Sequence, residues 1–521
     1  MKNKKQFLWF ALSIVFVLIS SSVIAQTQQP NIVLIISDDH AYQAISAYNK
    51  GLAQTNNIDR IANEGVIFNK AYVTNSLCGP SRAAILTGKY SNKNGYKENE
   101  KSFFDASQNS FIKELTNSGY QTAWVGKYHI GNRPEGFTYW QILPGQGMYY
   151  NPDFLMMDGS KKRVEGYVTN IVENVAEDWL NNRDTTKPFC IVVGHKATHR
   201  TWMPDTCDLG MFDKQKFALP ENFYDDYKNR LAAQQQDMTI SKTMVMGYDL
   251  KMFDNKEDEN NEGSFKRMNA AQRNKFDEYY RPIYENLKSK NLSGNALTEW
   301  KFQRYMKDYL STAASLDRNI GRMLNYLDAH HLSQNTIVIY MSDQGFFLGE
   351  HGWFDKRWMY EESFRTPMVM RYPKLIQPGT IDNHFVLNID IAPTLLQAAG
   401  VAIPKDMQGE SFLPLIKNKN SKGRNAIYYH YYENGEHKVS PQFGIKTNQY
   451  KLIRFYERVE SWELYDLEKD PHEMHNLFGK NGYEKIAIEL KKKLETLINE
   501  YDDEEALQIL HKQILGAKRN F

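Results

Sequence analysis

Short apolar runs and stretches of helical periodicity alternate along most of the chain. Four runs predict strands buried on both faces, as in a parallel sheet: 31–36, 121–125, 188–194 and 336–341. Between them, 168–181 and 305–327 carry apolar residues at helical spacing. Strands that alternate with helices predict an α/β fold with a large, mostly parallel sheet flanked by helices.

The pattern changes after about residue 410. Three segments are typical of antiparallel strands joined by polar turns: 425–430, 442–447 and 450–455. A charged helical stretch follows at 483–503. We therefore expect a main domain over 26–410 and a smaller C-terminal α+β domain with an antiparallel sheet over 411–521.

One long stretch, from about residue 203 to 299, differs from the rest of the predicted main domain. It is polar, with acidic and amide-rich segments such as 255–262. We expect it to form an insertion of helices and loops outside the core.

The first residues have the pattern of an export signal. Lys2, Lys4 and Lys5 precede a mostly apolar run at 7–24, and Ala25 closes a small-residue stretch. The alternative is a membrane anchor, but the run is near the lower limit for a span and polar residues follow almost at once. We expect a signal peptide over 1–25, an exported periplasmic or secreted protein, and no stable membrane insertion after cleavage.

Charge and cysteine content narrow the function. Residues 1–25 hold three lysines and no acid, so the remaining chain has 61 basic and 62 acidic residues. This balance gives no indication of nucleic-acid binding, and an anionic substrate would need local basic groups. Three cysteines are too few for a disulfide framework, and pairing of Cys190 with Cys207 is left open.

Polar clusters follow each of the four predicted buried strands. The clusters are Asp38–Asp39, Lys127–His129, His195–His199 and Asp343–Gln344. In open α/β sheets, ligands bind outside the carboxyl ends of the strands, so these clusters predict one site. Three carboxylates and an amide oxygen suit a hard cation, Ca²⁺ or Mg²⁺, rather than zinc. A turn or a helix cap is the alternative for the paired aspartates.

Residues 77–88 read L-C-G-P-S-R-A-A-I-L-T-G and carry the strongest motif. Pro80 and Gly88 frame a short helix, which places Cys78 at its N-terminus, where an anion is favoured. The alternative for a lone cysteine is a small buried side chain. The string C-x-P-S-R followed by L-T-G resembles the signature of the type I sulfatases.

The resemblance implies a fold, a modification and a set of roles. The fold would be an alkaline-phosphatase-like sandwich, and a maturation enzyme would convert Cys78 to formylglycine. One divalent cation, Ca²⁺ rather than Mg²⁺, would be bound by Asp38, Asp39, Asp343, Gln344 and residue 78. The family pattern assigns further catalytic roles to Arg82, Lys127, His129, His199 and Lys356.

The resemblance also implies a mechanism. One hydroxyl of the hydrated aldehyde attacks sulfur, and the alcohol leaves with a proton from His199. The second hydroxyl then loses its proton, with His129 as the base, and sulfate is expelled. Arg82 would hold the modified residue and the sulfate, with Lys127 and Lys356 on the sulfuryl oxygens.

The stretch 343–363, D-Q-G-F-F-L-G-E-H-G-W-F-D-K-R-W-M-Y-E-E-S, resembles bacterial sulfatases that act on 6-O-sulfated N-acetylglucosamine in glycosaminoglycans. Candidate sugar contacts are His195, Trp353, Arg357, Trp358, Glu361, Glu362 and His437, with packing under the loop as the alternative for Trp358. Gln442 aligns where this subgroup often has a histidine. Galactose-6-sulfate or an algal polysaccharide unit therefore stays an alternative substrate.

Two other functions compete with a sugar sulfatase. A phosphodiesterase or phosphonate hydrolase of the same superfamily could carry a similar site. A glycan-binding protein would result if Cys78 were never converted. The sequence lacks a histidine-rich second metal site, and its intact set of ligands and bases argues against a binding protein.

Overall fold

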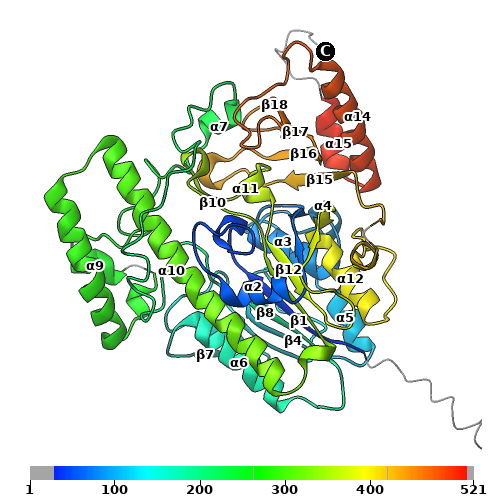
Figure 1. Ribbon diagram of the computed structural model, residues 1–521, viewed down its shortest axis with the longest axis horizontal. Helices are drawn as coiled ribbons and strands as arrows, with labels where there is room; N and C mark the ends of the chain where they lie inside the picture. Colours follow the sequence, from blue (N-terminus) through cyan, green and yellow to red (C-terminus); the bar gives the residue numbers. More distant parts are fainter. Residues whose placement is uncertain (1–28, 262, 419, 513–521) are drawn as a thin grey trace, which may run out of the picture.

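The computed structural model describes residues 29–261, 263–418 and 420–512 (Figure 1). The expected signal peptide at 1–25 lies outside these residues. Within the described part of the chain, no helix combines the length and apolar character needed to cross a membrane.

A ten-stranded sheet forms the centre of the molecule, in the order β13-β2-β12-β9-β1-β8-β4-β5-β6-β7. Its strands are β1 (Asn31–Ser37), β2 (Val66–Phe68), β4 (Gln121–Lys127), β5 (Tyr139–Leu143), β6 (Asp153–Met156), β7 (Lys161–Arg163), β8 (Phe189–Gly194), β9 (Thr336–Ser342), β12 (Met368–Arg371) and β13 (Thr380–Asp382). The neighbours β9, β1, β8, β4 and β5 are all parallel, whereas β12 runs antiparallel to β9. The predicted, mostly parallel sheet is therefore confirmed.

Helices cover both faces of this sheet. One face carries α2 (Asn56–Asn63), α6 (Val168–Asn182) and α10 (Gly294–Ala329), and the other carries α3 (Cys78–Thr87), α5 (Phe111–Asn117) and α12 (Ile391–Ala398). Successive residues of a strand point to opposite faces. Accordingly, Val33 and Ile35 of β1 pack in one hydrophobic cluster, and Ile32, Leu34 and Ile36 pack in the other.

The stretch 203–299 was expected to lie outside the core, and that expectation was wrong. It contains α7 (Leu231–Gln235), α8 (Lys256–Asn261) and α9 (Ala270–Lys290). Phe217, Met244 and Phe276 are buried in the same cluster as Val33 of the central strand. The buried residues of α9 (Phe276, Tyr280, Tyr284 and Leu287) have helical spacing, but elsewhere the apolar residues are scattered among polar ones, and the polar composition concealed them.

A second, four-stranded antiparallel sheet lies above the large one in Figure 1. It consists of β15 (Ala426–Tyr431), β16 (Gln442–Thr447), β17 (Tyr450–Phe455) and β18 (Ser461–Asp466). The helix expected over 483–503 is present as α14 (Glu484–Glu500), and a further helix, α15 (Glu504–His511), follows it. The two helices are separated at Asp503, whose carboxylate accepts a hydrogen bond from Ala506 N and caps α15.

Short elements complete the fold. They are β3 (Ala71–Tyr72) paired with β14 (Val386–Leu387), β10 (Phe347–Leu348) paired with β11 (Phe354–Asp355), and the helices α4 (Ser91–Asn94), α11 (Glu361–Phe364) and α13 (Leu413–Lys417).

One acidic side chain in the core, Glu173, forms no ion pair within 4.0 Å among the described residues. Glu173 of α6 is 1% exposed, and its Oε1 has no hydrogen-bond partner among the described residues. Burial, with the nearby Glu177 charge, raises the pKa of Glu173 to about 8. A raised pKa in an acid means that the folded protein holds this proton more tightly than the unfolded chain does.

Glu173→Gln should therefore become more stabilising, relative to the parent protein, as the pH rises. The protonated carboxyl stabilises fully below its unfolded pKa of about 4.5, and this contribution is lost as the pH approaches about 8. Urea unfolding should show that the free energy of unfolding of Glu173→Gln, minus that of the parent protein, is larger at pH 8 than at pH 5 by roughly 1–3 kcal/mol. A difference that does not change with pH would contradict this account.

Candidate active site

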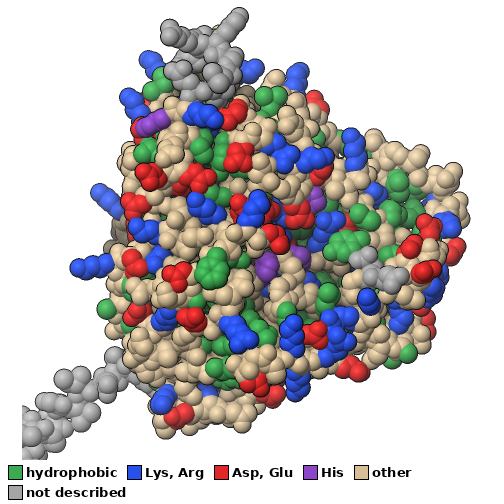
Figure 2. All heavy atoms as spheres, turned by 180° about the vertical axis from the view of Figure 1, so that it is seen from behind, with side chains coloured by type: hydrophobic (Ala, Val, Ile, Leu, Met, Phe, Trp, Pro, Cys, Tyr) green, Lys and Arg blue, Asp and Glu red, His purple; other side chains and the backbone are tan. Residues whose placement is uncertain are grey.

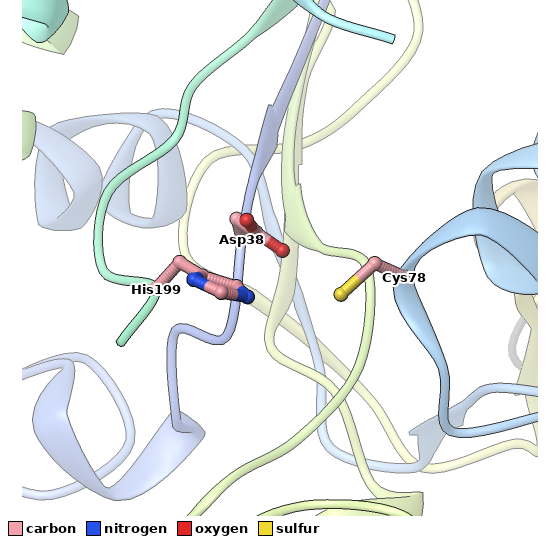
Figure 3. Close-up of side chains that lie close together, drawn as sticks. All are labelled: Asp38, Cys78 and His199. Carbon is pink, nitrogen blue, oxygen red and sulfur yellow. The ribbon is translucent and has the colours of Figure 1, made fainter. Parts of the chain in front are cut away.

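Strands of the large sheet end at a common edge, and polar side chains gather there. Asp38 follows β1, Lys127 is the last residue of β4, and Asp343 follows β9. Figure 3 shows Asp38 and His199, from the loop after β8, directed toward Cys78 of helix α3. The possible ligand atoms of these three residues lie within 4.8 Å of one another. The structure thus brings the predicted clusters together.

Two glycines allow the strand ends to approach closely. Gly126 of β4 has a φ of 90°, and a Cβ atom there would lie 2.1 Å from the carbonyl oxygen of Gly194 in β8. A side chain at Gly194 would meet the carbonyl oxygen of Lys127 at 2.2 Å. Residues with side chains would therefore force apart the two strands that deliver Lys127 and the histidine loop.

Three carboxylates share one buried volume. Oxygens of Asp38, Asp39 and Asp343 lie within 4.8 Å of one another, and all three side chains are buried. Burial and the charges of the neighbouring carboxylates raise the pKa of Asp39 to about 6 and of Asp343 to about 7. Asp38 Oδ1 and Gln344 Oε1 have no hydrogen-bond partner among the described residues. Buried carboxylate and amide oxygens with free lone pairs fit a hard divalent cation.

Two lysines oppose this negative charge. The ammonium of Lys127 contacts the Asp38 carboxylate and donates to Gln146 Oε1 at 2.6 Å. Lys356 Nζ lies 2.7 Å from Asp39 Oδ2. Burial by itself would raise the pKa of Asp38, but Lys127 and other basic neighbours outweigh it and hold the pKa well below its usual range. The site therefore alternates anionic and cationic groups over a few ångströms.

Arg82 is completely buried, and its donors are directed at protein acceptors. Nε donates to Asp343 Oδ2 at 2.9 Å and Nη1 donates to the Lys127 carbonyl at 2.8 Å. Nη2 lies 3.4 Å from the Ser37 carbonyl. Arg82 therefore holds Asp343 and two strand ends together, and its expected contact with a sulfate stays a prediction.

Cys78 is the first residue of α3, and its thiol is fully buried. Gln344 Nε2 lies 3.7 Å from its sulfur. Burial, reinforced by the Asp38 charge, raises the pKa of the Cys78 thiol. An unmodified cysteine here is a neutral thiol and therefore a poor nucleophile.

The three histidines predicted at these strand ends have different surroundings. His199 Nδ1 lies 2.6 Å from the Arg200 carbonyl, and its Nε2 lies 3.9 Å from Asp39 Oδ2. His195 is fully buried and His129 is half-buried, and their Nδ1 atoms have no hydrogen-bond partner in the described part of the chain. Burial lowers the pKa of His199 and of His129 well below the usual value and that of His195 to about 3.

A cavity of about 370 Å³ opens over this cluster. Its wall consists of Glu98, Asn99, Glu100, Lys101, Gln146, His199, Arg200, Tyr248, Asp355, Lys356, Arg357, Glu433, Gly435 and Glu436. A larger cavity of about 520 Å³ lies elsewhere, between Tyr372 and Leu413, and no residue of the charged cluster lines it. The cavity beside His199 and Lys356 is therefore the one that opens onto the charged cluster.

Of the predicted sugar contacts, Arg357 lies in the cavity wall. Its guanidinium forms ion pairs with Glu433, at 2.5 Å, and with Glu436, both from the loop after β15. His437 is connected to the cavity through Asp355, since its Nε2 lies 3.2 Å from Asp355 Oδ2.

The other predicted sugar contacts do not line the cavity. Trp353 and Trp358 are completely buried, with ring centroids 4.9 Å apart, so the packing alternative describes Trp358. Glu361 forms an ion pair with Lys451 at 2.8 Å, and Glu362 is buried beside it in α11. His195 is also fully buried and absent from the cavity wall.

Gln442, the departure from the subgroup pattern, is buried as well. Its Oε1 accepts a hydrogen bond from Met359 N at 3.1 Å. Its Nε2 donates to the carbonyls of Arg357 and Ser440 at 3.3 and 3.2 Å. Gln442 therefore supports the backbone that carries Arg357 and is not itself in the cavity wall.

Several wall residues were missed in the sequence. Gln146 fixes Lys127, and Arg200 and Tyr248 form one side of the cavity. Arg200 directly follows the H-K-A-T-H string, which was a usable signal. Tyr248 lies in the polar stretch that was placed outside the core, and no local pattern marks it.

The fold and this cluster define a hydrolytic site for an anionic ester. The family model described as "Sulfatase" matches residues 30–401, and the family model described as "N-sulphoglucosamine sulphohydrolase, C-terminal" matches residues 349–500. The chain belongs to the sulfatase family and is a sulfuric ester hydrolase. Members of this family generally use a formylglycine, made from a cysteine, and a divalent metal ion.

Individual relatives agree with this assignment. The N-acetylglucosamine-6-O-sulfatase of Bacteroides thetaiotaomicron is 46% identical over 491 residues, which cover 92% of this chain and 88% of that protein. A solved structure described as a complex with its substrate D-glucosamine-2-N,6-O-disulfate has a TM-score of 0.90 at 45% identity, covering 93% of this chain and 100% of that chain. A phosphonate monoester hydrolase of Agrobacterium radiobacter shares the fold, with a TM-score of 0.67 at 18% identity, over 91% of this chain and 96% of that chain.

The carboxylate cluster predicts that a divalent cation stabilises the fold. A cation that binds only the folded protein, at about 100 times its Kd, adds about 2.7 kcal/mol, so the Tm should rise by a few degrees over chelator-treated protein. Asp343→Asn should abolish most of this rise in differential scanning calorimetry.

Asp208→Asn provides a matched control. Asp208 lies in a second cluster, with Asp205 and Cys207, where Arg318 already forms an ion pair with it at 2.7 Å. This variant should keep the full rise in Tm, and equal losses in the two variants would count against the cation site at Asp343.

Proposed function

We propose that this sulfatase removes the 6-O-sulfate of N-acetylglucosamine or N-sulfated glucosamine in glycosaminoglycan fragments. The observation that carries the proposal is the match to a structure of TM-score 0.90 described with D-glucosamine-2-N,6-O-disulfate as substrate. The activity printed for the 46% identical relative supports the same sugar. A cavity of about 370 Å³ that ends at the charged cluster suits one sulfated sugar unit.

Residue 78 is the proposed nucleophile. Its place at the N-terminus of α3, beside Asp38 and His199, supports oxidation to formylglycine by a maturation enzyme. As a hydrated aldehyde it supplies an oxygen nucleophile and a second hydroxyl for the release of sulfate. The buried, neutral thiol would provide neither.

Asp38, Asp39, Asp343, Gln344 and residue 78 are the proposed ligands of one Ca²⁺ ion. Three carboxylates from two strand ends suit Ca²⁺ better than Mg²⁺, which keeps several waters and takes fewer carboxylates. A bound cation would polarise a sulfuryl oxygen and offset the negative charge of the ester.

Lys127 and Lys356 are placed to stabilise the sulfuryl oxygens, because both ammonium groups lie at the carboxylate cluster. His199 is the proposed acid for the leaving alcohol, and His129 the proposed base for the second half of the reaction. Burial and nearby lysines hold the pKa of His199 low, and a bound anionic ester opposes that repulsion and favours its protonated form.

The charge pattern of the protein agrees with local recognition of an anion. On the face seen in Figure 2, acidic and basic side chains are interspersed without a large field of one sign. This mixture supports an oligosaccharide substrate over nucleic acid.

We also propose a signal peptide over 1–25, export to the periplasm or medium, and a division of the remaining chain into domains over 26–410 and 411–521.

The experiment that tests the substrate measures sulfate release by matured protein from N-acetylglucosamine-6-sulfate, with galactose-6-sulfate alongside. Release from the first sugar is expected, while Cys78→Ala should abolish it without loss of cooperative unfolding. Cys207→Ala, which changes an exposed thiol, should keep full activity. Release only from galactose-6-sulfate would overturn the sugar assignment, and a phosphodiester as the sole substrate would overturn the sulfatase assignment.

His199→Ala should slow poor leaving groups more than good ones. An alkyl alcohol needs a proton as it leaves, so kcat/KM on the sugar sulfate should fall by about 10²–10⁴. An activated aryl sulfate, whose phenolate leaves unaided, should lose far less. His331→Ala, at an exposed position, is the control, and equal losses on both substrates would eliminate His199 as the acid.

A further inference from the structure

The segment 245–251 of the long polar stretch contacts the residues that directly follow His199. Asp249 is fully buried, and its two oxygens accept from Arg200 Nε at 2.6 Å and from Nη2 at 2.8 Å. The same carboxylate accepts from Val245 N at 2.7 Å, which folds the segment around it. Arg200 is thereby held in one orientation by a bidentate ion pair.

Lys251 fixes the next two residues of the backbone. Its ammonium lies 2.6 Å from the Thr201 carbonyl, 2.9 Å from the Trp202 carbonyl and 3.1 Å from Asp308 Oδ2. The side chain is completely buried, and burial lowers its pKa despite the Asp308 charge. A buried lysine is costly to desolvate, so its donors hold the few acceptors available to them in a defined geometry.

The orientation of His199 depends on this backbone. The Nδ1 atom of its ring lies 2.6 Å from the Arg200 carbonyl oxygen, which can only accept. That bond places the proton on Nδ1 and directs Nε2 toward Asp39, 3.9 Å away. A rotation of the Arg200 carbonyl would therefore turn the imidazole and change the atom that it offers to the cavity.

We infer that Asp249 and Lys251 are positioning residues for His199. Asp249 holds the Arg200 side chain, and Lys251 holds the carbonyls of Thr201 and Trp202. The Arg200 carbonyl then sets the tautomer and the direction of the His199 ring. The inference rests on the proposed role of His199 as the acid for the leaving alcohol. It gives the polar stretch 203–299 an indirect part in catalysis, through the orientation of His199.

The test is a double-mutant cycle on N-acetylglucosamine-6-sulfate with matured full-length protein. Lys251→Met and Asp249→Asn should each lower kcat at least tenfold with KM within about twofold, and neither should lower kcat further in a His199→Ala background. Losses that add to that of His199→Ala, a rise in KM at unchanged kcat, or unchanged kinetics in both variants would overturn the inference.

Lys301→Met is the matched control. Lys301 Nζ also binds carbonyls of the same stretch, Ser241 at 3.2 Å and Met244 at 3.0 Å, but none next to His199. It should lose stability comparably and keep its kcat. If Lys251→Met does not unfold cooperatively, the milder Asp249→Asn decides.

A crystal structure of Asp249→Asn separates this inference from the proposed function. A displaced His199 ring that has lost the contact from Nδ1 to the Arg200 carbonyl supports it, whatever substrate the enzyme accepts. A ring in the parental position overturns it. If His199→Ala keeps full activity on the sugar sulfate, the proposed acid fails, while the structural comparison still decides whether Asp249 positions the ring.

Discussion

Repulsion among three buried carboxylates is the constraint to which the rest of the site responds. Asp39 and Asp343 carry raised pKa values because burial and neighbouring charges disfavour their ionised forms. Arg82, Lys127 and Lys356 reach the cluster from a helix, a strand and a loop that are far apart in the sequence. The fold must therefore be complete before this charge arrangement becomes tolerable, which couples the active centre to global stability.

The lysine loop illustrates how that requirement is met. In the sequence, two completely buried tryptophans, Trp353 and Trp358, flank Lys356. The ring of Tyr360 is stacked on that of Trp353, with 5.9 Å between the ring centroids. Aromatic side chains have few rotamers, so their packing fixes the backbone around the lysine with little remaining freedom. The stretch 343–363 resembles sulfatases that act on one sugar, and its aromatic residues account for part of that resemblance by holding Lys356 in place rather than by contacting a sugar.

The parts of the molecule that could be predicted from sequence are those encoded locally. The four central strands are continuous apolar runs, and the polar residues that follow them lie at one edge because the strands are parallel. The motif at Cys78 contains its own helix start and stop, with Gly88 at a φ of 66°. These features required no knowledge of distant contacts.

The walls of the cavity could not be predicted in the same way. Tyr248 and Glu433 come from segments without periodicity, and only the packing of the stretch 203–299 and of the second sheet brings them to the same cavity wall. Sequence adjacency was misleading for Trp358 and Glu361, because neighbours of a functional lysine can face the core as readily as the ligand. The side to which each residue points is decided by tertiary packing.

The ion pairs of Arg357 with Glu433 and Glu436 have a consequence for how such proteins diverge. The chemical centre lies on the large sheet, while this part of the cavity wall belongs to the loop after β15 of the second sheet. Sugar preference can therefore drift through substitutions in the second sheet while the residues that break the ester bond stay constant. For the same reason the two sheets cannot be exchanged between relatives as independent modules, since the wall of one cavity contains residues from both parts of the chain.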